Sequence, residues 1–145
     1  MMKNPFKGAT VEHVCLPSTH PKLTAEFLAR LGGEIIKEIP GGAIFCLFGG
    51  QIFELNYARN YEVPPGKTCH IAIPFPSSET YTEAVAWMKG AFTPEEVSFQ
   101  EESEGTEVRY ALVVIPGAVT LQPIFRAVPL RPAQATPSSG NNPEC

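Results

Sequence analysis

The chain has 145 residues, of which 43% are hydrophobic, and a formal net charge of −4. This length is typical of one domain, or of two small modules that share a core. The acidic charge argues against nucleic acid and anionic membranes as partners. No stretch approaches the roughly 18 uninterrupted apolar residues of a membrane-spanning helix. We therefore expect a soluble, cytoplasmic protein.

The N-terminal half predicts an extended segment, a helix and three strands. Residues 10–16 have an extended pattern, and Pro21 suits the first turn of a helix because it needs no backbone donor there. Apolar residues on one face of that helix predict its buried side: Leu23, Phe27, Leu28 and Leu31. Glycines end the helix. Turn residues then separate three predicted strands: residues 34–39, 43–48 and 51–57.

The C-terminal half predicts the same order of elements. Residues 68–75 are extended, and Ser77 begins a second helix as a cap residue. Three more strands are predicted: residues 97–101, 107–115 and 119–125. We expect a single domain over residues 1–125, made of modules at about 9–57 and 68–125. Proline, serine, glycine and asparagine dominate residues 126–145, which predicts a disordered tail.

The two halves also repeat one another in sequence. Residues 12–17 (EHVCLP) align with residues 69–74 (CHIAIP), so that His13 is equivalent to His70. Residues 43–50 align without gaps with residues 111–118, and this alignment sets Glu54 against Gln122. A chain that duplicates a strand-borne histidine and a strand-borne acid or amide is expected to be built around one shared polar site.

Strand alternation tests this idea, because successive residues of a strand point to opposite faces. Each predicted strand has one apolar face for the helices and one mixed face for a cavity. The mixed faces carry the repeated residues and three neighbours: His13, Cys15, Glu54, Asn56, His70, Thr120 and Gln122. Glu12 falls on the opposite face, so we leave it out. Arg109 lies on a strand and is a candidate for binding an anionic substrate group.

The cysteines favour neither disulfides nor a structural zinc site. Cys15, Cys46 and Cys69 lie in predicted strands and Cys145 is the last residue, and none forms a C-x-x-C pair. We expect buried free thiols. Cys15, two residues after His13 on the cavity side, is also a candidate nucleophile.

A βαβββ module used twice, with histidines on the first and fifth strands and an acid on the fourth, resembles the vicinal oxygen chelate superfamily. That superfamily includes glyoxalase I, methylmalonyl-CoA epimerase, extradiol dioxygenases, and fosfomycin- and bleomycin-resistance proteins. The resemblance implies an α+β fold, in which the two modules form a cupped eight-stranded mixed sheet with helices on its outer face. It also implies a homodimer and a divalent metal at the base of the cup. His13, Glu54 and His70 match the metal ligands, and Gln122 falls at the fourth ligand position.

The sequence is most similar to glyoxalase I around residues 53–57 (FELNY) and 66–73 (GKTCHIAI), but it departs from that enzyme in two ways. The fourth ligand there is a glutamate that moves the substrate proton. Here the position holds Gln122, or Leu121 if the preceding turn is aligned without an insertion. Pro17 and Ala58 stand where glyoxalase I carries an arginine and an asparagine for glutathione. Glutathione chemistry is therefore not expected.

Two imidazoles and a carboxylate leave a divalent metal with open positions for substrate or water. Our first hypothesis is a metal-dependent lyase, isomerase or epimerase that chelates a small oxygen-rich substrate. Glu54 would move the proton, because the amide of Gln122 cannot act as a base but can hydrogen-bond the substrate. The expected substrate contacts are Cys15, Asn56, Thr120 and Arg109. The residues do not distinguish nickel, zinc, cobalt, manganese and iron.

Two alternatives remain open. The same triad suits a non-haem iron(II) dioxygenase. A metal-free protein that binds or sequesters a small molecule, of the bleomycin-resistance kind, would use His13 and His70 only as hydrogen-bonding residues of the cavity.

Overall fold

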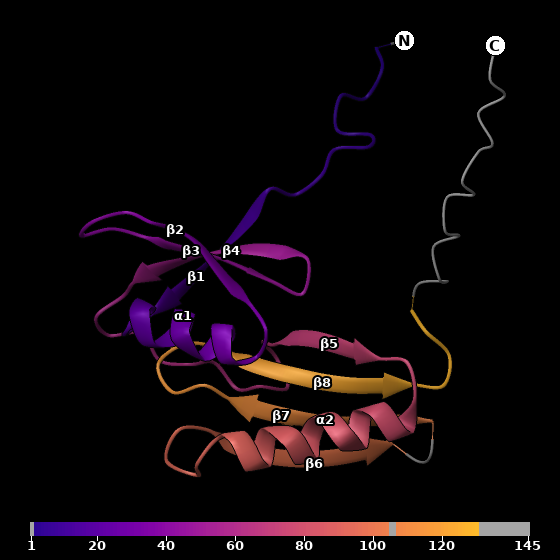
Figure 1. Cartoon of the computed structure of the whole chain (residues 1–145). Helices are drawn as coiled ribbons and strands as arrows, with labels where there is room; N and C mark the ends of the chain where they lie inside the picture. The colour runs from indigo at the N-terminus through magenta and orange to yellow at the C-terminus, as the bar shows by residue number, and fades with distance from the viewer. Residues whose placement is uncertain (1, 105–106, 131–145) are drawn as a thin grey trace, which may run out of the picture.

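The computed structural model describes residues 2–104 and 107–130, which form two modules of the same design (Figure 1). The first module contains β1 (His13–Ser18), α1 (Pro21–Arg30), β2 (Glu34–Glu38), β3 (Ile44–Phe48) and β4 (Gln51–Tyr57). The second contains β5 (Ile71–Phe75), α2 (Ser78–Ala91), β6 (Ser98–Glu104), β7 (Val108–Val114) and β8 (Thr120–Arg126). The predicted α+β class with paired βαβββ modules is confirmed. Of the expected disordered tail, Arg126 belongs to β8, residues 127–130 are exposed, and residues 131–145 lie outside the described part.

Each module forms its own four-stranded mixed sheet. The strand order is β1-β4-β3-β2 in sheet A and β5-β8-β7-β6 in sheet B. β1 runs parallel to β4 and β5 runs parallel to β8, and the other pairs are antiparallel. The eight strands are therefore divided between two sheets, which refines the expectation of one cupped eight-stranded sheet. β1, which begins with His13, and β5, which follows His70, are both edge strands.

The helices begin where the sequence predicts. Pro21 occupies the first turn of α1, where its missing N–H costs no hydrogen bond. Ser77 caps α2 by accepting a hydrogen bond from the backbone N–H of Thr80, whose side chain bonds back to Ser77. No helix in the described part of the chain is long and apolar enough to cross a membrane.

The buried side of α1 is rotated relative to the predicted one. Thr24, Ala25, Phe27 and Leu28 are buried, whereas Leu23 is 62% exposed. Leu28 packs on the inner residues of sheet A, while Phe27 turns to the other module and stacks on Phe92 with ring centroids 4.3 Å apart. A single helix thus contacts both modules, and this is why its buried side is wider than a simple amphipathic pattern predicts.

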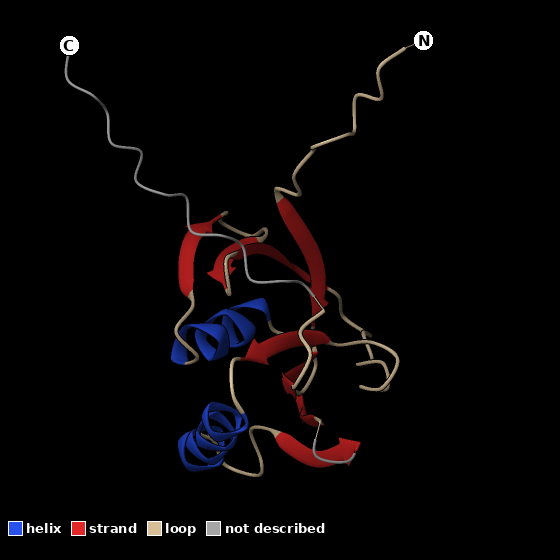
Figure 2. Ribbon diagram, turned by 90° about the vertical axis from the view of Figure 1, so that its right-hand side faces the viewer, coloured by secondary structure: helices blue, strands red, loops and turns tan. Residues whose placement is uncertain are grey.

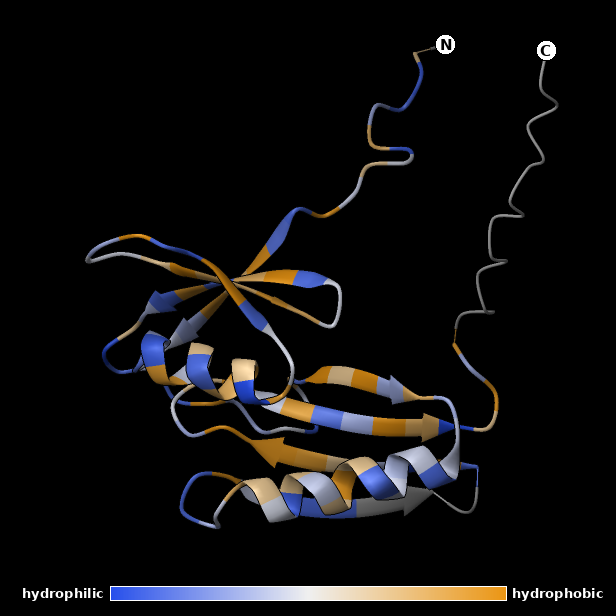
Figure 3. Ribbon diagram, viewed as in Figure 1, coloured by the Kyte–Doolittle hydropathy of each residue, from blue (hydrophilic) through white to orange (hydrophobic). Residues whose placement is uncertain are grey.

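The two modules are joined on their helical side, where Figure 2 shows the helices one above the other. Arg30 of α1 binds Glu96 at 2.7 Å and lies over the ring of Phe92, 4.3 Å from its centroid. The backbone N–H of Thr19 donates to the carbonyl of Gly117 at 2.8 Å. Most of β7 is hydrophobic (Figure 3), and it lies at the centre of the second module's core. These contacts leave the opposite faces of the sheets, called open faces below, for a site.

Candidate functional site

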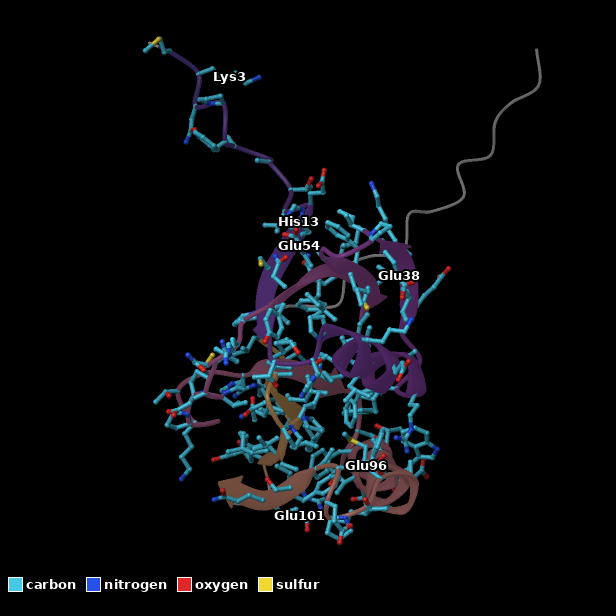
Figure 4. All side chains as sticks on the ribbon, turned by 90° about the vertical axis from the view of Figure 1, so that its left-hand side faces the viewer. Lys3, His13, Glu38, Glu54, Glu96 and Glu101 are labelled. Atoms are coloured by element: carbon cyan, nitrogen blue, oxygen red, sulfur yellow. The ribbon has the colours of Figure 1, made fainter. Side chains whose placement is uncertain are left out.

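His13 and Glu54 meet on the open face of sheet A. The parallel register pairs Cys15 with Glu54, and His13 lies two residues before Cys15, on the same face of the sheet. The Nε2 atom of His13 lies 3.4 Å from Oε2 of Glu54, and Figure 4 shows the two side chains together near the start of β1. Their side chains are 36% and 23% exposed. The structure thus brings together one imidazole and one carboxylate, accessible to a ligand.

Glu12 holds the other nitrogen of His13. Nδ1 lies 3.0 Å from Oε1 of Glu12, and a carboxylate can only accept, so Nδ1 is the donor. Leaving out Glu12 was wrong, because it precedes β1 and strand alternation does not apply to it. The ring of Phe45 from β3 contacts the imidazole edge-on, with centroids 5.8 Å apart. His13 is therefore oriented with Nε2 turned to Glu54.

Cys15 and Asn56 lie beside this pair. The side-chain amide of Asn56 donates to the Sγ of Cys15 at 3.0 Å. Cys15 is exposed, so the expectation of buried thiols is wrong for this residue and for Cys69, and right for Cys46. Cys15 lies in the first half of the edge strand β1, where the residues on both faces are exposed. Cys46 points to α1, and burial raises the pKa of its thiol.

His70 lies on the second module, one residue before β5. Its Nδ1 is 2.6 Å from the carbonyl oxygen of Gly66, which can only accept, so Nδ1 carries the proton. The register between β5 and β8 pairs Ile71 with Leu121 and Ala72 with Gln122, and His70 immediately precedes the first of these pairs. His70 therefore repeats the arrangement of His13, with Nδ1 held by an oxygen and Nε2 left for a ligand.

Thr120 and Gln122 lie on the open face of sheet B and are buried, with exposures of 1% and 8%. Leu121 points to the opposite side, where it is wholly buried in the core beneath α2. Of the two residues considered for the fourth ligand position, Gln122 is therefore the one on the open face. The Oγ1 atom of Thr120 is buried and has no hydrogen-bond partner in the described part of the chain.

Arg109 lies on the other side of sheet B. Its guanidinium donates to the hydroxyls of Ser78 and Thr82 at 2.8 Å each, and it lies over the ring of Tyr81, 4.8 Å from the centroid. Arg109 thus packs against α2, away from the face that carries Gln122. We leave it out of the site proposed below.

Comparison with known proteins identifies the fold. The sequence matches no protein-family model, and no curated protein is significantly similar to it. Solved structures are similar: a glyoxalase/bleomycin resistance protein/dioxygenase from Nocardioides has a TM-score of 0.66 and 17% identity, over 94% of this chain and 93% of that one. The chain has the glyoxalase/bleomycin resistance/dioxygenase fold. The fold that the repeated modules predict is thereby confirmed.

Other proteins with this fold bind metals or drugs. A mutant of the fosfomycin resistance protein FosX from Listeria monocytogenes, complexed with Mn(II) and a dihydroxypropylphosphonic acid, has a TM-score of 0.62 and 18% identity, over 84% of this chain and 92% of that one. A bleomycin-binding protein complexed with bleomycin has a TM-score of 0.59 and 20% identity, over 81% and 99% of the two chains. The glyoxalase-like fold thus serves both metal-binding and drug-binding proteins.

The donors of this chain fit a divalent metal in type, but the chain divides them into two pairs, one in each module. His13 and Glu54 contact one another on sheet A, whereas His70 precedes β5, Gln122 lies on β8, and the two are paired here only because they share a module. Within the described residues, no group of three or more His, Cys, Asp or Glu side chains is arranged so that it could hold a metal ion. A cavity of about 390 Å³ lies at the junction of the modules, lined by Phe27, Arg30, Glu96 and Ile115 among others, and none of the four donors lines it.

Proposed function

We propose that the protein is a metal-dependent enzyme, a lyase, isomerase or epimerase, that acts on a small oxygen-rich substrate. The observation that carries this proposal is the matching state of the two histidines. Each has Nδ1 bonded to an oxygen, from Glu12 or from Gly66, and a neutral ring that donates from Nδ1 leaves Nε2 unprotonated. Metal-ligating histidines are held in this way by an oxygen acceptor at their other nitrogen.

We further propose that two chains complete the site as a homodimer. A pair of protein ligands is fewer than catalytic metal centres commonly use. The pair on sheet A would meet the pair on sheet B of a second copy, since the two modules of one chain do not bring their pairs together. The open face around His13 supports such a contact, because Phe45, Leu47 and Ile52 leave apolar surface accessible there.

In this proposal His13, Glu54, His70 and Gln122 would hold the metal, which would supply Lewis-acid stabilisation of negative charge on substrate oxygens. Glu54 accepts and returns the substrate proton, because it is the carboxylate on the open face next to the metal-binding imidazole. Gln122 hydrogen-bonds the substrate or ligates through its amide oxygen. Cys15 and Asn56 form the adjacent wall. Glutathione is not proposed as a co-substrate, since Pro17 and Ala58 offer no side chain to bind it.

The experiment is elemental analysis of protein purified without a metal-affinity tag. We expect bound divalent metal in the wild type, and its loss in His13→Ala and in His70→Ala. His20→Ala is the matched control, because His20 is an exposed histidine outside both pairs. Wild-type protein that stays metal-free after reconstitution would refute the metalloenzyme proposal. If iron is found, oxygen consumption distinguishes a dioxygenase from a lyase or isomerase.

Mixing the two histidine variants tests the dimer. In a site shared between chains, a heterodimer of His13→Ala and His70→Ala contains one site with all four donors intact and one with both histidines missing. Metal binding should therefore reappear when the two metal-free variants are unfolded together and refolded. No recovery in the mixture, with wild-type protein recovering under the same treatment, would contradict a site shared between chains.

A metal-free binding protein is the second candidate, and one observation favours it. Both ring nitrogens of His13 already have carboxylate partners, Glu12 at 3.0 Å and Glu54 at 3.4 Å. Such a histidine can serve as a hydrogen-bonded wall residue without a metal. This candidate predicts stoichiometric binding of a small molecule that chelators do not affect and that survives the double change His13→Ala with His70→Ala.

A further inference from the structure

The segment between β4 and His70, residues 58–69, is called the strap below. Gly66 of the strap lies against the open face of sheet B at Thr120. A Cβ atom on residue 66 would be 2.8 Å from Cγ2 of Thr120, and 3.4 Å from both Cδ1 of Leu112 and Oγ1 of Thr120. Real Cβ atoms essentially never approach other heavy atoms as closely as 2.8 Å, so a side chain at this position would require the strap or Thr120 to shift.

Backbone conformation does not account for a glycine at this position. The glycines with positive φ in the described residues are Gly8, Gly32, Gly41, Gly49, Gly50 and Gly117. Gly66 is not among them, so alanine would be compatible with its φ angle. The absent side chain is therefore needed for the close approach of the strap to β8.

This close approach delivers the Gly66 carbonyl to His70. The oxygen accepts a hydrogen bond from Nδ1 at 2.6 Å. The strap makes a hydrogen-bonded turn here, in which the carbonyl of Pro65 accepts from the backbone N–H groups of Thr68 and Cys69 and from the Thr68 hydroxyl. Two features thus set the position of the Gly66 carbonyl: the turn that starts at Pro65, and the contact of Gly66 with Thr120.

We propose that Gly66 is a positioning residue for His70. Its missing side chain seats the strap on Thr120, and its carbonyl holds the imidazole in the tautomer that leaves Nε2 free for a ligand. Taking that ligand to be a metal rests on the proposed function. Seating and tautomer are properties of the chain itself, and can be measured without any metal.

The test compares Gly66→Ala with the wild type and with a control variant by nitrogen-15 NMR at alkaline pH, where the chemical shifts of the two ring nitrogens report the tautomer. The His70 signals are assigned by their absence in His70→Ala. We expect the wild type to carry its proton on Nδ1 and Gly66→Ala to become a mixture of tautomers. Gly90→Ala is the matched control, because Gly90 lies exposed in α2 with no heavy atom within 4 Å of an added Cβ. It should leave His70 unchanged.

Thr120→Ser provides the rescue. This change removes Cγ2, the atom that an alanine Cβ would strike, and keeps the hydroxyl. The double variant Gly66→Ala with Thr120→Ser should therefore regain the wild-type tautomer. A wild-type proton on Nε2, an unchanged tautomer in Gly66→Ala, or no rescue in the double variant would each overturn the inference. The measurement of the wild-type tautomer needs no Gly66 variant, so it tests the inference even if Gly66→Ala does not fold.

Metal titration separates this inference from the proposed function. Gly66→Ala should lower metal affinity about 10- to 100-fold, the usual cost of losing a partner of a ligating histidine, and the double variant should restore it. If the tautomer behaves as expected but the wild type binds no metal, the metalloenzyme proposal fails and the positioning role of Gly66 stands. If metal binds equally well to the wild type and to Gly66→Ala, the positioning role fails and the metal site stands.

Discussion

Replacing Thr120 with valine should stabilise the protein. Thr120 is 1% exposed, and its Oγ1 has no hydrogen-bond partner in the described part of the chain. A buried hydroxyl without a partner costs about 1–3 kcal/mol, the desolvation that folding does not return. Valine has nearly the same shape and removes that cost. At this chain length, each kcal/mol raises the melting temperature by roughly 2–4 °C.

Urea and thermal unfolding measure the effect, with Thr120→Ser as the control. Serine keeps the hydroxyl and loses a buried methyl group, so we expect it to destabilise the fold by about 1 kcal/mol. The two changes thus have opposite signs. If valine is no more stable than the wild type, the hydroxyl is satisfied in solution, and the reasoning from its isolation is refuted. If valine is more stable and also binds ligand more weakly, the hydroxyl is kept for the ligand at a cost in stability.

Three further predictions concern the histidine partner on sheet A, the junction of the modules and the thiols. Glu12→Ala should release Nδ1 of His13 and lower metal affinity about 10- to 100-fold, measured beside an exposed control, Glu62→Ala. The backbone N–H of Thr93 and then Arg30 hold the pKa of Glu96 below its usual 4.5. A depressed folded pKa stabilises the fold above the unfolded value and loses that effect as pH falls through the folded value, so the stability difference between wild type and Glu96→Gln should shrink in acid. In native protein, Cys15 and Cys69 should react with thiol reagents while Cys46 reacts only on unfolding, as peptide mapping would show.

The order and most boundaries of the elements could be predicted from the sequence, because turn residues separate them. The predicted fourth strand, residues 51–57, coincides with β4, which is preceded by Gly49 and Gly50 in left-handed conformations that glycine adopts readily. The helix starts at Pro21 and Ser77 were predicted equally well. Boundaries were less accurate where no such residue stops the strand: β1 begins at His13 and runs to Ser18, later than the predicted residues 10–16.

Strand alternation predicted the faces of the site residues but not their partners. His13 and Glu54 share an open face as predicted, and Gln122 rather than Leu121 lies on the open face of sheet B. Alternation failed at Glu12, which lies outside a strand, and it gave no side for Arg109, which packs against α2. The role of Gly66 could not be predicted from the sequence. A glycine that lets the backbone approach a neighbouring strand closely cannot be distinguished there from a glycine that forms a turn. Whether the donors of the two modules come together depends on how the modules pack. Alternation within a strand carries no information about that packing.

The packing of α1 explains why one chain separates its donors. Phe27 and Arg30 hold α1 against Phe92 and Glu96, so the modules are joined by their helical sides. On the open face of sheet A, His13 and Glu54 stay accessible, whereas the open face of sheet B is covered at Thr120 by Gly66 of the strap. A sheet face with accessible Phe45, Leu47 and Ile52 around an oriented imidazole is costly to leave in water. A second copy would cover that face and supply the missing donors at once. The contact of α1 with the second module, which stabilises the monomer, therefore makes the proposed site depend on the dimer. Replacing Arg30 with alanine should weaken the contact between the two modules without altering any of the four proposed metal ligands.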